Sequence, residues 1–190
     1  MADIASLDPF RLRVLKAMTA ALKTITVENG YRHNLADKLE HGVNMACVFR
    51  GRQQFGDGDP LPMVSVLEHP RALDPQTTDD DQKQDRVGEW DLLIQGFVKD
   101  DPENPTDPAH HLVAEVIACL AKEGRRRSPA LDGGRGEPNI LGLGSREPCV
   151  TKLAIGSPVV RPADGVNSSQ AFFWLTLTLT LAEDVEKPFA

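Results

Sequence analysis

The stretch Phe172-Phe-Trp-Leu-Thr-Leu-Thr-Leu-Thr-Leu181 decides the fold of this chain. Every second residue from Phe173 to Leu181 is apolar, and the residues between them are Trp174 and three threonines. This period of two places the apolar residues on one face of a β-strand, the leucine face, whereas a helix would scatter them around its circumference. We therefore predict a strand that ends at Glu183-Asp184, covers a core with its leucine face and presents a semi-polar second face.

Two segments have the pattern of amphipathic helices, and each begins at an Asp-Pro pair, at residues 8–9 and 107–108. Aspartate caps a helix well, and proline suits the first helical position. We predict that the first helix ends near Val27, before Asn29-Gly30, and that the second ends at Gly124. The apolar faces consist of Phe10, Val14, Met18, Leu22 and Ile25 in the first helix, and of Leu112, Val113, Val116, Ile117 and Leu120 in the second.

Shorter strands are predicted at Met45–Arg50, Met63–Leu67, Trp90–Val98, Val150–Ile155 and Val159–Arg161. Segments rich in glycine, proline and polar residues separate them, and neighbouring strands can pair through hairpins. The order of elements predicts an α+β fold, in which two helices pack on one face of a mainly antiparallel sheet. We expect one domain over residues 1–190, with long irregular loops at about 70–88 and 125–147.

The composition is that of an ordinary globular domain, with 190 residues, 41% hydrophobic and 26% charged. No apolar run approaches the roughly 20 residues that a membrane helix needs, and we expect no membrane association. The net charge of −7 disfavours nucleic-acid binding by neutralisation of phosphates. The three cysteines are widely spaced, so we expect buried, reduced thiols rather than disulfides or a zinc site.

No segment has the pattern of a catalytic, cofactor-binding or metal-binding site. Gly51–Gly56 lacks the Lys-Ser/Thr of a phosphate loop, and Asp57-Gly58-Asp59 lacks the rest of a calcium loop. The side chains of His110 and His111 would point about 100° apart on a helix, so they cannot form a two-histidine metal face. We interpret these segments as loops, polar turns and an exposed histidine pair, and we predict neither catalytic residues, nor a metal, nor a cofactor.

Arg125-Arg126-Arg127 is the one basic run in the sequence. It could contact phosphate or DNA, it could cap the C-terminus of the second helix, or it could pair with an acidic loop of a neighbouring subunit. The acidic run Asp79-Asp80-Asp81 would be its partner in the third case, although such a run alone is most often a solvated loop. The candidate subunit-interface residues are Asp79, Asp80, Asp81, Arg125, Arg126, Arg127 and Trp174.

Several segments together resemble the tail terminator (tail completion) proteins of tailed bacteriophages. The segments are Leu22–Tyr31, Val48–Arg52, Phe55–Glu68, Trp90–Pro108, Gly156–Asp164 and Phe172–Glu183. The resemblance implies an α/β subunit that forms a homohexameric ring. Such a ring caps the finished tail tube and joins it to the head connector, and DNA passes through its lumen.

What the resemblance implies is a structural virion protein without catalytic residues. Its partners would be other copies of the chain, the tail tube protein and the head–tail connector protein, and it would lie in the virion neck after assembly in the host cytoplasm. We also hypothesise that residues 70–88 reach the tube or an adjacent subunit. The alternatives are another phage neck or connector protein (a head-completion or minor tail protein), a small enzyme or ligand-binding module, and a DNA-binding regulator, for which a helix-turn-helix pattern is missing.

Overall fold

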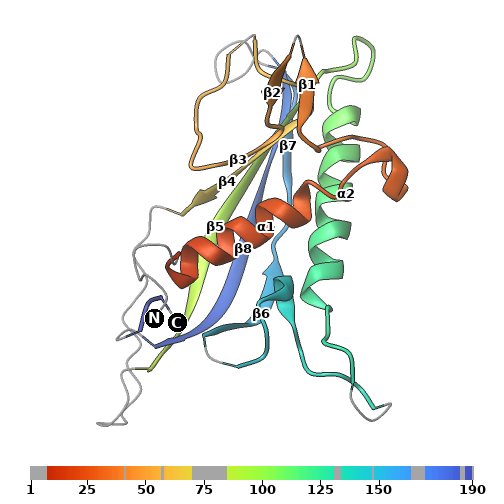
Figure 1. Ribbon diagram of the computed structural model, residues 1–190. Coiled ribbons are helices and arrows are strands. Elements are labelled where there is room, and N and C mark those ends of the chain that lie inside the picture. The colour runs from red at the N-terminus through yellow and green to blue at the C-terminus, as the bar shows by residue number, and fades with distance from the viewer. Residues whose placement is uncertain are drawn as a thin grey trace.

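The computed structural model describes residues 8–40, 42–56, 58–69, 85–130, 134–146, 148–163, 170–184 and 187–189. Figure 1 shows a twisted sheet with two α-helices and a small separate hairpin. The elements are α1 (Phe10–Leu22), the 3₁₀ helix η2 (Val27–Asn29), β1 (Lys38–Glu40), β2 (Val43–Met45), β3 (Val48–Arg50), β4 (Met63–Glu68), β5 (Asp85–Val98), α2 (Asp107–Gly124), the 3₁₀ helix η3 (Ile140–Gly142), β6 (Cys149–Ile155), β7 (Val159–Arg161) and β8 (Ala171–Asp184).

The main sheet has the strand order β3-β4-β5-β8-β6, and β7 pairs with β8 on the same side as β6. The long strands β5 and β8 pair antiparallel over their whole length, from Asp85↔Asp184 to Val98↔Ala171. Every other described pair in this sheet is antiparallel except β3 with β4. The α+β fold with a mainly antiparallel sheet is thereby confirmed.

The strand at 172–181 is the centre of the core, as its period of two predicts. All five side chains of the leucine face are at most 2% exposed. The residues that alternate with them are different, since Trp174 is half-buried and Thr176 is exposed. Burial of so much apolar surface is the main term that stabilises the sheet against the helices.

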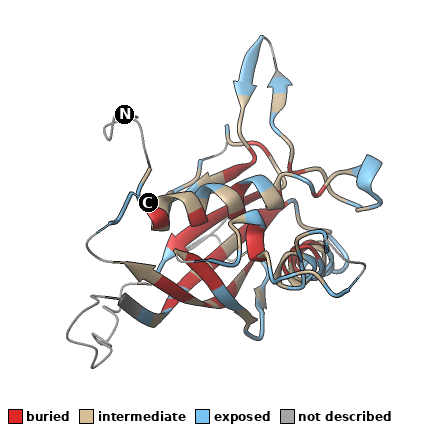
Figure 2. Ribbon diagram, turned by 60° about the horizontal axis from the view of Figure 1, so that its bottom comes forward, coloured by how far each residue is buried: buried red, intermediate tan, exposed pale blue. Residues whose placement is uncertain are grey.

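Both helices pack on the leucine face of the sheet, as predicted (Figures 1 and 2). The apolar side chains of α1 and α2 join those of β4, β5 and β8 in one continuous cluster. The second helix keeps the predicted limits, with Asp107-Pro108 at its start and Gly124 at its end. The predicted aspartate caps are not formed, because the N-cap positions are Pro9 and Thr106 and neither helix has a side-chain cap hydrogen bond. Its buried residues are Ala109, Leu112, Val113, Val116, Cys119 and Leu120.

The first helix is shorter than predicted, because α1 ends at Leu22 rather than near Val27. Backbone bonds from Thr24 and Ile25 to carbonyls three residues earlier tighten the chain there, and Ile25 is fully buried. Thr26 then accepts a hydrogen bond from the backbone N–H of Asn29 and so caps η2. The apolar period continues past Leu22 because the core continues, although the helix does not.

Two other sequence-based predictions need correction. The loop predicted at 70–88 runs too far, because β5 begins at Asp85, in a stretch without an apolar pattern, and pairs there with Ala182–Asp184. The strand predicted at Met45–Arg50 is two strands, and β3 pairs with β4 in parallel rather than through a hairpin. The described part of the loop predicted at 125–147 contains one short element, η3, whose Ile140 and Leu141 are buried. None of the described helices has the length and apolar character that crossing a membrane requires.

Candidate interaction surfaces

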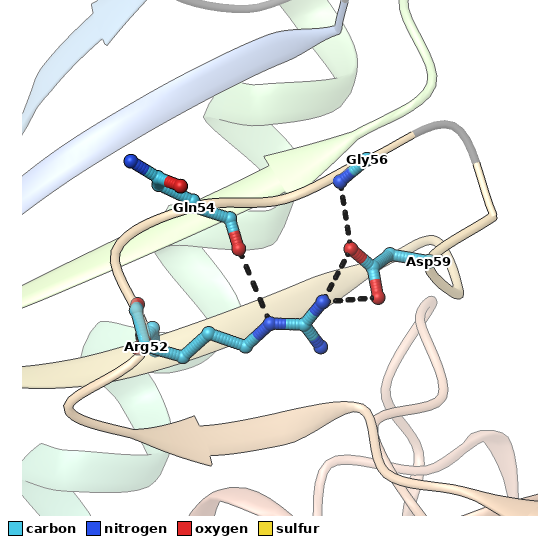
Figure 3. Close-up of polar contacts among 5 residues, drawn as sticks. Arg52, Gln54, Gly56 and Asp59 are labelled. Atoms are coloured by element: carbon cyan, nitrogen blue, oxygen red, sulfur yellow. Dashed lines mark hydrogen bonds and ion pairs between the residues drawn. The ribbon is translucent and has the colours of Figure 1, made fainter.

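The loop between β3 and β4 is held against the second face of the sheet by Arg52. Nη2 of Arg52 contacts both carboxylate oxygens of Asp59, at 2.6 and 2.7 Å, and Nε donates to the carbonyl of Gln54 at 3.2 Å (Figure 3). Asp59 also accepts the backbone N–H of Gly56 at 2.8 Å. Partial burial alone would raise the pKa of Asp59, but the Gly56 N–H and the Arg52 guanidinium together lower it.

Arg52 also lies over aromatic rings. Its guanidinium carbon is 4.5 Å from the ring centre of Phe49 and 5.1 Å from that of Phe55, a cation–π arrangement. We call Arg52, Asp59 and these two rings the clasp. The sequence from residue 51 to residue 59 predicts only a loop and a polar turn. The contacts of this loop with the sheet were not predicted.

The clasp begins a row of aromatic rings that crosses the second face of the sheet. Neighbouring ring centres along the row lie between 4.7 and 6.1 Å apart, which is the range for aromatic pairs. Trp174 ends the row, and Val159, its cross-strand partner on β7, is 42% exposed. One side of Trp174 packs against Phe172 within the fold, so only the exposed part of its side chain is available for an interface. The row consists of Phe49, Phe55, Phe97, Phe172 and Trp174.

The three arginines after α2 are exposed, and each one contacts its own chain. Nε of Arg125 donates to the carbonyl of Ala121 at 3.1 Å, which is the helix-capping geometry among the three predicted alternatives. Arg126 forms an ion pair with Glu123, also at 3.1 Å. Nη1 of Arg127 donates to the carbonyl of Gly136. A guanidinium has five N–H donors, so these contacts leave each arginine with donors for a partner.

The acidic residues proposed as partners for these arginines cannot be placed. Asp79, Asp80 and Asp81 lie outside the described residues, as do residues 70–84 of the loop predicted to reach the tube or a neighbour. Their contact with the arginine run therefore stays a prediction.

The hairpin of β1 and β2 is a surface that sequence analysis missed. Figure 2 shows it protruding from the body of the molecule. Leu39 is 76% exposed and Val43 is 63% exposed, and the register places them on opposite faces of the hairpin. Nζ of Lys38 donates to the carbonyl of Leu61 at 2.8 Å and ties the base of the hairpin to the loop between β3 and β4. We call β1 and β2 the arm.

Strands of three residues carry too little alternation to predict the arm. One signal was available, since Gly42 adopts a left-handed φ of 80° in the turn and glycine favours that conformation. An isolated two-stranded hairpin is marginally stable in water. Its exposed apolar side chains on both faces are therefore the strongest indication of a binding partner on the described surface.

A partly buried contact between Glu115 and His33 fastens the segment that leads to the arm. Glu115 of α2 accepts the backbone N–H groups of Arg32 and His33, and one of its oxygens lies 2.7 Å from Nδ1 of His33. All of these partners of Glu115 belong to the same chain. The arrangement holds the chain after η2 against α2 and so limits how the arm can move.

The three cysteines are buried, at 5% exposure or less, as predicted. Burial raises the pKa of the Cys119 thiol, so this group is a poor nucleophile. Within the described ranges, His, Cys, Asp and Glu side chains form no group that could hold a metal ion.

Comparison with known proteins adds no family to these observations. No protein-family model matches the chain. The search of curated proteins also found no match. The resemblance described above and the surfaces of the molecule are therefore the basis for a functional proposal.

Proposed function

We propose that this chain is a structural protein of a tailed phage, and that a homohexameric ring of it closes the tail tube and joins it to the head connector. DNA passes through the lumen of the ring without sequence-specific binding. The partners are other copies of the chain, the tail tube protein and the head–tail connector protein. The protein acts by assembly and not by catalysis.

The observation that carries the proposal is where the resembling segments lie. Val48–Arg52 includes β3, and Phe55–Glu68 includes β4 and most of the loop before it. Trp90–Pro108 includes most of β5 and the start of α2. The last two segments include β7 and β8. Apart from Leu22–Tyr31, which covers the end of α1 and η2, these segments thus contribute adjacent strands of one sheet. A resemblance that covers one contiguous structural unit is stronger support than the same residues spread over unrelated places.

The described surface supports an assembly role in a second way. The arm presents Leu39 and Val43 to solvent on opposite faces, so it suits insertion between two partner surfaces. A hairpin that extends from one subunit can also add its free edges to the sheet of a neighbour.

The test is production of virions without this protein, followed by electron microscopy and by complementation with the wild-type chain. We expect abnormally long tails or tails that are not joined to heads, and restoration on complementation. Normal virions would eliminate the proposal. Tails of normal length beside heads that lose their DNA would indicate the alternative, a head-completion protein of the neck.

A further inference from the structure

The segment that leads into α2 carries an excess of negative charge. Residues 99–107 contain four carboxylates and one ammonium group, a net charge of −3. Glu103 and Asp107 are exposed, and Asp100 and Asp101 are half-buried. Asp101 accepts the backbone N–H groups of Glu103 and Asn104, so it shapes the turn. We call residues 99–107 the acidic end of α2.

The other end of α2 carries the opposite charge. Residues 122–127 contain four cations and one carboxylate, a net charge of +3. Lys122, Arg125 and Arg126 line an open hollow together with Glu123, and Lys122 and the three arginines are exposed. We call residues 122–127 the basic end of α2. In Figure 1 the acidic end lies at the top of the molecule and the basic end at the lower end of α2.

The two ends are too far apart to neutralise each other within one subunit. The helix has 18 residues. At a rise of about 1.5 Å per residue this corresponds to about 27 Å. The Debye length at physiological salt is about 8 Å, so attraction between exposed charges at that separation is screened. Each end is therefore available to a charged partner outside the subunit.

The helix dipole explains only part of this pattern. It favours acidic residues in the first turn and cations in the last turn, as Asp107 and Lys122 are. The effect falls off within one turn. Asp100 and Glu103 precede the helix, and Arg127 follows it. The acidic residues before the helix and the basic residue after it lie outside the helical turns that the dipole affects, so the dipole does not account for them.

We infer that the acidic end of α2 in one copy binds the basic end of α2 in the next copy, head to tail around the ring. This inference rests on the proposed ring function and names its subunit contact. A cyclic ring uses two different patches that face apart on each subunit, and these two ends have opposite charge and lie at opposite ends of one helix. The arginines thereby gain an acidic partner, residues 99–107 of the next copy, that lies within the described part of the chain.

A second copy fits these surfaces better than nucleic acid does. DNA would use the basic end alone, and a chain with a net charge of −7 would repel its phosphates. A twofold dimer in which each patch meets its own copy would place like charges together. Opposite charges at a contact steer association and fix its register, while like charges cost several kcal/mol.

The experiment measures the mass of the intact chain by light scattering over a range of protein concentrations. One variant, Asp100→Lys with Glu103→Lys, makes both ends basic. The other, Lys122→Glu with Arg127→Glu, makes both ends acidic. Asp101, Arg125 and Arg126 are left unchanged because Asp101 shapes the turn, Arg125 caps the helix and Arg126 pairs with Glu123.

We expect the wild-type chain to form a closed multi-subunit ring at about 50 mM NaCl and to lose subunits at about 500 mM, where the screening length is much shorter. Each variant alone should need at least about tenfold more protein to associate. An equimolar mixture of the two variants should recover the ring mass, because every contact in an alternating ring is then complementary.

Matched controls change the net charge equally at other exposed positions. They are Glu28→Lys with Glu68→Lys, and Arg146→Glu with Lys152→Glu. These controls should assemble as the wild type does. Circular dichroism of all four variants checks that they remain folded.

The possible failures are distinguishable. If the wild type forms a ring and both end variants form it equally well, or if their mixture does not recover, this inference is wrong and the ring function stands. An assembly that stops at two subunits also contradicts the head-to-tail contact. A wild-type chain that stays a single subunit at every concentration overturns both proposals, as would a single subunit that binds duplex DNA through the basic end.

Discussion

Gly96 of β5 lies directly opposite Phe173 of β8, and the phenyl ring occupies the space where a β-carbon at position 96 would be. A Cβ built on Gly96 would lie 2.1 Å from Cε1 of Phe173. A glycine in the middle of a strand usually weakens it. Here the absence of a side chain at Gly96 leaves room for the phenyl ring of Phe173 against the sheet.

We predict that Gly96→Ala destabilises the protein by about 1–3 kcal/mol, because overpacking forces either the ring or the strand to move. Gly88→Ala is the matched control, since it lies on the same strand with open space around its Cβ position. That variant should change the free energy of unfolding by less than about 0.5 kcal/mol. Urea unfolding measures both, and equal effects would contradict the packing argument.

The alternation in β8 makes a second prediction. Leu177→Ala should cost about 2–5 kcal/mol, because Leu177 is fully buried and its truncation leaves a cavity. Thr176→Ala, one residue earlier, should cost less than about 0.5 kcal/mol because Thr176 is exposed. Urea unfolding measures both variants, and equal losses of stability would contradict the alternation of buried and exposed residues in β8.

The clasp should contribute to stability in a way that depends on the shape of arginine. Arg52→Lys keeps the charge but loses the two-oxygen contact with Asp59 and the stacking on Phe49 and Phe55. We expect a loss of about 1–2 kcal/mol, reduced from the value of a fully buried pair because the Arg52 side chain is 37% exposed. Lys16→Arg at an exposed helix position is the control, and thermal unfolding measures both.

The lowered pKa of Asp59 gives the clasp a pH dependence of known sign. Since the pKa of Asp59 in the folded protein lies below its ordinary value, the carboxylate contributes stability that is complete above that ordinary value. The contribution is lost as the pH falls through the folded pKa. The difference in unfolding free energy between the wild type and Asp59→Asn should therefore be constant near neutral pH and shrink under acid conditions. A difference that grows on acidification would show that the sign is wrong.

The elements that the sequence predicts correctly are those with a long, regular pattern. The five apolar residues of β8 and the apolar face of α2 each repeat one period several times, and both elements were found at the expected limits. Local periodicity does not determine which strands pair. The parallel contact of β3 with β4, and the insertion of β8 between β5 and β6, result from competition among all strands for the core.

The surfaces were harder to predict than the core. Arg52 and Asp59 are two polar residues in a loop with several glycines, and their role depends on rings that come from other strands. The arm consists of strands too short to show a period. Among the candidate residues from sequence, Arg125 has a contact that matches one predicted alternative, while Trp174 is held in the aromatic row.

The arm provides the clearest separation of folding from assembly. Leu39→Ser with Val43→Ser removes two apolar side chains that are mostly exposed, so the free energy of unfolding of the single subunit should change by less than about 0.5 kcal/mol. If the arm inserts between partner surfaces, the same variant should fail to join tails to heads in complemented virions, because the buried apolar area is lost. Val27→Ser with Val87→Ser removes other exposed valines and should leave joining intact. A variant of the arm that supports normal virions would show that the exposed hairpin has no partner in assembly.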